Sequence, residues 1–171
     1  MIMNKGKLTL LCGKMGAGKS THARKMAKDK SAVLLSEDEW LAAFYPNKIN
    51  SLDDYLNYSK LLKPQVKKLV QSVLLAGVNV VLDFPANTVS QRQWLRGIFA
   101  EIDAPHSLVF LDVSDELCLQ RVAKRAIEQP QRAVTDTDAM FEAITQHFVP
   151  PSVDEGFNVV QFPESQQQSN G

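Results

Sequence analysis

The stretch that decides the fold is residues 13–20, GKMGAGKS, which match the pattern G-x-x-x-x-G-K-[ST] at every specified position. An apolar run, KLTLLC at residues 7–12, precedes it, and a segment of helical character follows to about Lys30. A glycine-rich turn between a strand and a helix lets backbone N–H groups surround a phosphate, and the helix dipole favours negative charge at the same place. The pattern therefore predicts a phosphate-binding loop rather than an incidental glycine-rich turn.

Each residue type in this loop has an expected chemical role. Lys19 is expected to reach the β- and γ-phosphates of a nucleoside triphosphate, and Ser20 to offer its hydroxyl to Mg²⁺. The predicted ligands are therefore ATP and Mg²⁺. The predicted nucleotide-binding residues of the loop are Gly13, Lys14, Met15, Gly16, Ala17, Gly18, Lys19, Ser20 and Thr21.

Apolar runs that read as strands alternate with helical segments along the rest of the chain. The further strands are expected at residues 32–35, 78–82, 108–111 and 158–162. Continuous apolar runs, each followed by a helix, indicate a parallel sheet covered on both faces. The predicted fold class is a three-layer α/β/α P-loop NTPase with a five-stranded, mainly parallel sheet.

Helical periodicity marks residues 52–76, 90–100 and 114–128. In the first of these segments the expected buried seam is Tyr58, Leu62, Val66, Leu69 and Val73, whose spacings of three and four residues are those of an amphipathic helix. Gly77 follows as a natural helix end.

Length and composition indicate one domain. The 171 residues fit a single α/β unit, expected over residues 1–163, followed by a disordered tail at residues 164–171, ESQQQSNG. Cys12 and Cys118 lack CxxC spacing and are expected to be buried thiols of a reducing compartment. No apolar stretch approaches the roughly 20 residues of a membrane span, and the N-terminus lacks a signal-peptide pattern. A cytoplasmic protein without a membrane partner is expected.

The charges balance, with 19 basic and 19 acidic side chains, but they are unevenly distributed. Residues 1–30 carry eight Lys or Arg and one acid, whereas six acids and no Lys or Arg follow Arg132. An anionic ligand would be drawn to the N-terminal end. A long polyanion is disfavoured by the neutral total, although a nucleic-acid end stays among the open substrates.

With its loop near the start of a short chain, the sequence resembles the small P-loop kinases. This group of AAA-type ATP-binding proteins includes the polynucleotide 5′-kinase domain, zeta toxin, chloramphenicol phosphotransferase and gluconate kinase, and the resemblance covers residues 7–162. It implies the kinase type of P-loop NTPase fold and an ATP-dependent phosphotransferase that moves the γ-phosphate of Mg·ATP to a hydroxyl of a small molecule or nucleotide. A nucleotide-binding module and an ATP hydrolase without an acceptor are the alternatives.

The resemblance also implies a carboxylate after the second strand that accepts the proton of the substrate hydroxyl. Asp38, in the stretch LSEDEW at residues 35–40, falls at this place. Alternatively, Ser36 caps a helix whose first turn the three acids stabilise, and both roles are compatible. The arginine that often follows in the polynucleotide-kinase pattern is absent, since Leu41 and Ala42 stand there.

Two further carboxylates end strands. Asp83 closes the third run and resembles a Walker B acid, which would hold the Mg²⁺ shell together with Ser20; a strand-end cap is its alternative. Asp112 ends the fourth run, where a site role and capping of the helix that starts at Ser114 are equally favoured.

Arginines after the fourth run resemble the lid of these kinases. Arg121, Arg125 and Arg132 would contact the phosphates, and guanidinium groups there would stabilise charge on the transferring phosphoryl. A solvated helix face with Glu116 and Glu128 as partners is the alternative. The predicted catalytic residues are Lys19, Asp38, Arg121 and Arg125, while Arg125 and Arg132 also bind the nucleotide.

An aromatic cluster and two more arginines stay open in role. The cluster, which would either cover the acceptor or pack into the core, is Trp40, Phe44, Tyr45, Tyr55 and Tyr58. Arg92 and Arg96 would either meet an anionic acceptor or be surface charges.

Overall fold

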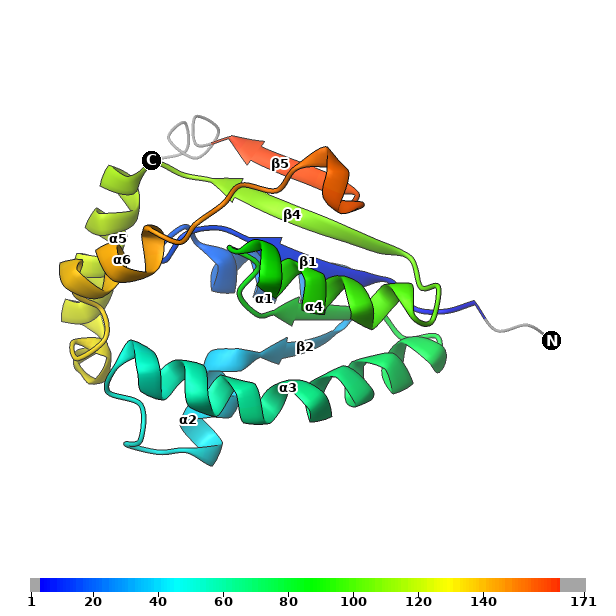
Figure 1. The fold of residues 1–171 in the computed structure, drawn as a ribbon, viewed down its shortest axis with the longest axis horizontal. Coiled ribbons are helices and arrows are strands. Elements are labelled where there is room, and N and C mark those ends of the chain that lie inside the picture. Colours follow the sequence, from blue (N-terminus) through cyan, green and yellow to red (C-terminus); the bar gives the residue numbers. More distant parts are fainter. Residues whose placement is uncertain (1–3, 164–171) are drawn as a thin grey trace.

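The computed structural model describes residues 4–163 and contains one five-stranded sheet. The strand order is β2-β3-β1-β4-β5 and every pairing is parallel. The strands are β1 Leu8–Cys12, β2 Val33–Ser36, β3 Val80–Asp83, β4 His106–Asp112 and β5 Val159–Pro163. All five arrows point toward the α5 and α6 end in Figure 1, so the carboxyl ends of the strands share one edge. The predicted α/β class is confirmed, with a sheet that is wholly parallel.

Helices connect the strands. They are α1 Lys19–Asp29, α2 Glu37–Phe44, α3 Leu52–Leu75, α4 Val89–Ala100, α5 Asp115–Glu128 and α6 Asp138–Thr145, with short 3₁₀ turns η1 Pro130–Arg132 and η2 Val153–Glu155. The three helices expected from periodicity are confirmed as α3, α4 and α5. The helix α6 has eight residues and was not predicted, because two turns offer too few positions for a periodic pattern to emerge.

The core has two sides because successive strand residues point to opposite faces of the sheet. Leu10 of β1 packs with α3 and α4 on one face, in a cluster that includes Val66 and Leu95. Its neighbour Leu11 packs on the other face with Ala23 of α1. Helix α5 covers that second face beside β4 through a separate buried cluster. These layers bring α1, α5 and the ends of β1 and β3 to one edge.

The apolar seam of α3 differs in part from the expected one. Leu62 and Val66 are buried as predicted, but Leu69 is 41% exposed and Val70 is fully buried in its place. The seam continues in steps of four residues, since each turn of an α-helix takes 3.6 residues and four-residue steps stay on one face. Gly77 adopts φ 84°, in the left-handed region that favours glycine, and ends the helix as predicted.

The buried state expected for Cys12 and Cys118 is confirmed. Within residues 4–163, no helix combines the length and the apolar character that a bilayer crossing needs. The tail predicted to be disordered, residues 164–171, lies outside the described residues.

Candidate active site

The glycine-rich loop joins the end of β1 to the start of α1 and lies against α5. Gly16 adopts φ 81°, and a Cβ built there would lie 2.5 Å from the carbonyl oxygen of Cys118 in α5. Only glycine fits this approach, because any side chain would displace backbone. Arg121 of α5 donates from Nη1 to the carbonyl oxygen of Ala17 at 3.2 Å. Helix α5 therefore packs directly against the glycine-rich loop.

Asn87, in the connection after β3, holds the first residue of the loop. Its Oδ1 accepts a hydrogen bond from the backbone N–H of Gly13 at 3.0 Å and one from the Cys12 thiol at 3.7 Å. Burial raises the pKa of Cys12 to about 11, so this thiol keeps its proton. The sequence analysis did not single out Asn87, although a polar residue beyond the carboxyl end of a strand is a usual signal for a site.

Ser20 and Asp83 meet at the other end of the loop. Ser20 Oγ donates to Asp83 Oδ2 at 3.1 Å. Burial is the main cause that raises the pKa of Asp83, and the nearby charge of Asp38 raises it further, whereas Lys19 lowers it. A hydroxyl and a carboxylate at hydrogen-bonding distance are hard oxygen ligands of the kind that Mg²⁺ takes. The donor set therefore fits the predicted metal, with Ser20 and Asp83 as the residues that could hold it.

Asp38 is the second residue of α2. Ser36 Oγ accepts the backbone N–H of Glu39 at 3.5 Å, so the expected helix cap is confirmed. The side chain of Asp38 is 64% exposed, and its Oδ2 lies 3.8 Å from Nη2 of Arg132. Because its charge also acts on Asp83, Asp38 shares the edge of the sheet with the loop. A solvent-facing carboxylate there is accessible to a second substrate.

Glu37, next to Asp38, ties α2 to α3. Its carboxylate is buried and accepts hydrogen bonds from the hydroxyls of Tyr55 and Ser59. Burial raises the pKa of Glu37 above its ordinary value, and the two hydrogen bonds partly oppose this shift. Burial and the Glu37 charge raise the pKa of Tyr55 as well. The sequence analysis treated the three acids alike and did not distinguish the buried one.

The arginines predicted to form a lid, Arg125 and Arg132, share an unexpected partner, Asp136. Arg125 forms two contacts with Asp136, from Nε to Oδ2 at 2.6 Å and from Nη2 to Oδ1 at 2.8 Å. Arg132 Nε donates to the same Oδ2 at 3.2 Å. Glu128 instead lies beside Lys124, at 3.7 Å. No local pattern marks Asp136 in the sequence, because its partners lie four and eleven residues away around a turn.

Lys14 has a side-chain contact of its own. Its Nζ pairs with Asp115 Oδ1 at the start of α5, at 2.7 Å, and lies 5.4 Å from the ring centre of Phe148. Because the ammonium of Lys14 has these partners, its predicted phosphate contact falls to its backbone N–H group. Lys19 is the first residue of α1, and its positive charge lowers the pKa of Asp83 and of Cys12.

Arg92 was expected either to meet an anionic acceptor or to be a surface charge, and the structure shows neither. It is fully buried, with Nε at 2.8 Å from Glu155 Oε1, and Nη1 donates to the carbonyl oxygens of Ala86 and Val149. Both expectations were wrong because residues 149–155 fold back over α4 and supply two of these acceptors, the Glu155 carboxylate and the Val149 carbonyl oxygen. Arg92 therefore fastens the connection between α6 and β5 to α4.

Asp112 does not cap α5, since Ser114 Oγ accepts the N–H of Leu117. Its Oδ2 instead accepts from Gln161 Nε2 of β5 at 3.1 Å. This contact leaves Asp83 as the strand-end acid next to the loop hydroxyl.

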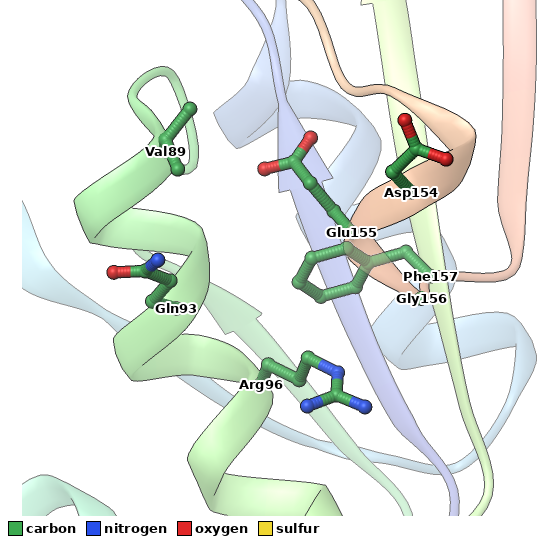
Figure 2. A pocket seen from close by; sticks show the side chains of 7 residues that line it. All are labelled: Val89, Gln93, Arg96, Asp154, Glu155, Gly156 and Phe157. Carbon is green, nitrogen blue, oxygen red and sulfur yellow. The ribbon is translucent and has the colours of Figure 1, made fainter.

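Arg96 lines a pocket elsewhere on the molecule. The pocket, of about 340 Å³, is formed by α4 and by the segment from Asp154 to Phe157. Figure 2 shows the Arg96 side chain reaching from α4 toward Gly156 and Phe157. It shares no residue with the loop, with Asp38 or with Asp83.

The aromatic cluster is mainly core. Trp40, Tyr45, Tyr55 and Tyr58 pack against the buried cluster under α3, and the rings of Tyr45 and Tyr58 are 4.4 Å apart. The packing interpretation is therefore confirmed for these four. Phe44 is 61% exposed, at the last position of α2.

Comparisons with known proteins agree with this geometry. The family described as an AAA domain, AAA_33, matches residues 8–151. A sugar kinase from Janibacter sp. HTCC2649 is 18% identical, with TM-score 0.63 and coverage of 94% of this chain and 89% of that chain. The APS kinase CysC of Mycobacterium tuberculosis, solved with AMPPNP and APS, is 17% identical, with TM-score 0.58 and coverage of 94% and 90%.

A third similar structure belongs to the Pnkp1/Rnl/Hen1 RNA repair complex. It is 21% identical with TM-score 0.61, and the match covers 88% of this chain and 50% of that one. The family match spans most of the chain, the fold is that of these P-loop kinases, and the loop occupies its expected place at the sheet edge. The chain belongs to the AAA domain family AAA_33.

Proposed function

We propose that this protein is an ATP-dependent phosphotransferase that moves the γ-phosphate of Mg·ATP to a hydroxyl of a small molecule or nucleotide. The observation that carries the proposal is the contact of Ser20 with Asp83 at 3.1 Å, beside a loop whose shape only glycine permits. The exposed carboxylate of Asp38 at the same edge of the sheet would bind the hydroxyl of the acceptor. The kinase fold of the similar structures supports the same class of reaction.

Nucleotide binding falls to the loop and its flanks. The backbone N–H groups of residues 13–20 and the ammonium of Lys19 would bind the phosphates. Ser20 and Asp83 would hold Mg²⁺, which when bound neutralises charge on the β- and γ-phosphates. The contact from Arg121 to Ala17 keeps α5 against the loop.

Transfer itself requires positioning and charge stabilisation more than covalent help from the protein. Asp38 would orient the acceptor hydroxyl and take its proton. The acceptor oxygen forms a bond to the γ-phosphorus, the bond from that phosphorus to the bridging oxygen breaks, and ADP leaves. Lys19, Arg121 and Arg125 would stabilise the negative charge on the equatorial oxygens.

The direct test is a screen for transfer of the labelled γ-phosphate from ATP to hydroxyl compounds. The panel holds sugars, nucleosides, an aminoglycoside and an oligonucleotide with a 5′-hydroxyl, beside a reaction without acceptor. The proposal predicts at least one phosphorylated product that the Asp38→Asn variant does not form. Phosphate release at an equal rate with and without acceptors would instead identify an ATP hydrolase, and nucleotide binding without either reaction would identify a binding module.

A further inference from the structure

The buried carboxylate of Asp136 accepts hydrogen bonds from two arginines near the end of α5, Arg125 and Arg132. The side chain of Asp136 is 1% exposed, and Arg125 and Arg132 direct three N–H groups at its two oxygens, at 2.6, 2.8 and 3.2 Å. Two guanidinium groups this close repel each other, and burying a carboxylate is costly unless it is fully paired. The Asp136 carboxylate reduces the repulsion between the two guanidinium groups, and their N–H groups in turn offset the cost of burying the carboxylate.

The position of this triad links both sides of the candidate active site. Arg125 lies one helical turn beyond Arg121, whose guanidinium contacts the loop at Ala17. Arg132 is the last residue of η1, and its Nη2 lies 3.8 Å from Oδ2 of Asp38 in α2. The segment that carries them lies at the end of the molecule to which the strands point (Figure 1). The triad thus connects helix α5, which contacts the loop, with the proposed acceptor carboxylate.

We propose that Asp136 is a positioning residue that holds Arg125 and Arg132 in one fixed orientation for the γ-phosphate. This inference rests on the proposed nucleotide-dependent function. The bidentate contact fixes the plane of the Arg125 guanidinium, which a single contact would leave free to rotate. Because one carboxylate neutralises one of the two charges, the pair keeps one net positive charge toward the site.

The first test compares nucleotides that differ in the γ-phosphate. Binding of Mg²⁺ with AMPPNP and with ADP is measured by calorimetry for the wild type and for Asp136→Asn. The amide NH₂ of asparagine faces guanidinium donors, so the pair loses its orientation. We expect affinity for AMPPNP to fall about tenfold and affinity for ADP to stay within about twofold. Equal losses for both nucleotides, or no loss for either, would overturn the positioning role.

A second comparison holds even where Asp136→Asn folds poorly. Arg125→Lys keeps the positive charge at a partly exposed position but cannot make the bidentate contact. We expect the same selective loss for AMPPNP, and unchanged AMPPNP binding would contradict the proposal. Glu128→Gln is the matched control, because this exposed acid of α5 pairs with Lys124, and it should bind both nucleotides like the wild type.

A mutant cycle separates positioning from folding. In a background with Arg125→Ala and Arg132→Ala, adding Asp136→Asn should change neither nucleotide affinity and should raise the melting temperature, since it removes an unpaired buried charge. A further selective loss for AMPPNP in that background would refute action through the arginines. Failure of the wild type to bind AMPPNP would reject the proposed function itself, whereas normal wild-type binding without selective losses rejects only the role of Asp136.

Discussion

Ser20 Oγ donates a hydrogen bond to Asp83 Oδ2 at 3.1 Å and so joins the start of α1 to the end of β3. Neighbouring parallel strands bring these residues together, because β1 pairs with β3 and both end at the same edge. A hydroxyl and a carboxylate held at this distance need little rearrangement to accept a cation, and we assign Mg²⁺ to them.

The first prediction concerns this pair. Asp83→Asn removes the charge but keeps the shape, so affinity for ATP in the presence of Mg²⁺ should fall about tenfold, while affinity measured with EDTA should stay unchanged. Calorimetry in both buffers gives the comparison. Asp112→Asn is the control, since Asp112 ends the next strand and bonds Gln161 instead. Equal Mg²⁺ dependence in wild type and Asp83→Asn would contradict the assignment.

The second prediction separates binding from transfer. Asp38→Asn should retain ATP affinity and lose phosphoryl transfer on the order of a hundredfold or more, since asparagine cannot accept the hydroxyl proton. The acceptor found in the labelled-ATP screen serves as substrate. Glu39→Gln, the neighbouring exposed acid, should retain activity. Normal transfer by Asp38→Asn would remove Asp38 from its role.

The third prediction is a pH dependence of stability. The pKa of Glu37 is raised by burial above 4.5, so its stabilising contribution is complete below the unfolded pKa and is lost as pH rises through the folded pKa. Glutamine at this position can accept from one of the two hydroxyls and donate its NH₂ group to the other, without ever ionising. The free energy of unfolding of Glu37→Gln should therefore rise relative to the wild type as pH increases from about 4 to about 8.

Urea denaturation across that pH range measures this difference. The matched variant is Glu39→Gln, whose carboxyl is exposed on the same helix turn, and its difference from the wild type should not grow with pH in this way. A constant difference for Glu37→Gln would show that the Glu37 carboxyl has the same pKa in the folded and unfolded chains.

The fourth prediction concerns the buried Arg92. Arg92→Met leaves Glu155 and the carbonyl oxygens of Ala86 and Val149 without their donor, so the free energy of unfolding should fall by about 3–5 kcal/mol. Arg96→Met changes an exposed arginine one turn further along the same helix and should have little effect. Thermal and urea unfolding of the two variants compare them, and equal stabilities would be inconsistent with the Arg92 contacts.

The fold could be predicted from sequence because its signals are local. The strand before the loop, the helix seam from Leu62 to Val66 and the end at Gly77 each depend on residues a few positions apart. Leu69 was wrongly predicted to be buried, because steps of three or four residues from Val66 both reach an apolar residue, Leu69 or Val70. The short helix α6 and the turn η1 carry too few apolar positions to be recognised.

The candidate site could be predicted where a motif fixes it and not where distant segments meet. Residues 13–20 and Asp83 follow from strand ends, and the Ser20 contact with Asp83 agrees with that expectation. The partners Asn87 and Asp136 depend on how loops fold in three dimensions. Arg92 shows the same limit, because the acceptors that bury it come from residues 149–155, more than fifty positions away.

The measurement that most directly tests the account is calorimetric titration of the protein with ATP and Mg²⁺, for the wild type and for Lys19→Ala. We predict saturable one-site binding by the wild type and at least a tenfold weaker affinity for Lys19→Ala, since the Lys19 ammonium is proposed to contact the β- and γ-phosphates. Absence of ATP binding by the folded wild type at millimolar concentration, or equal affinity of the two proteins, would contradict it.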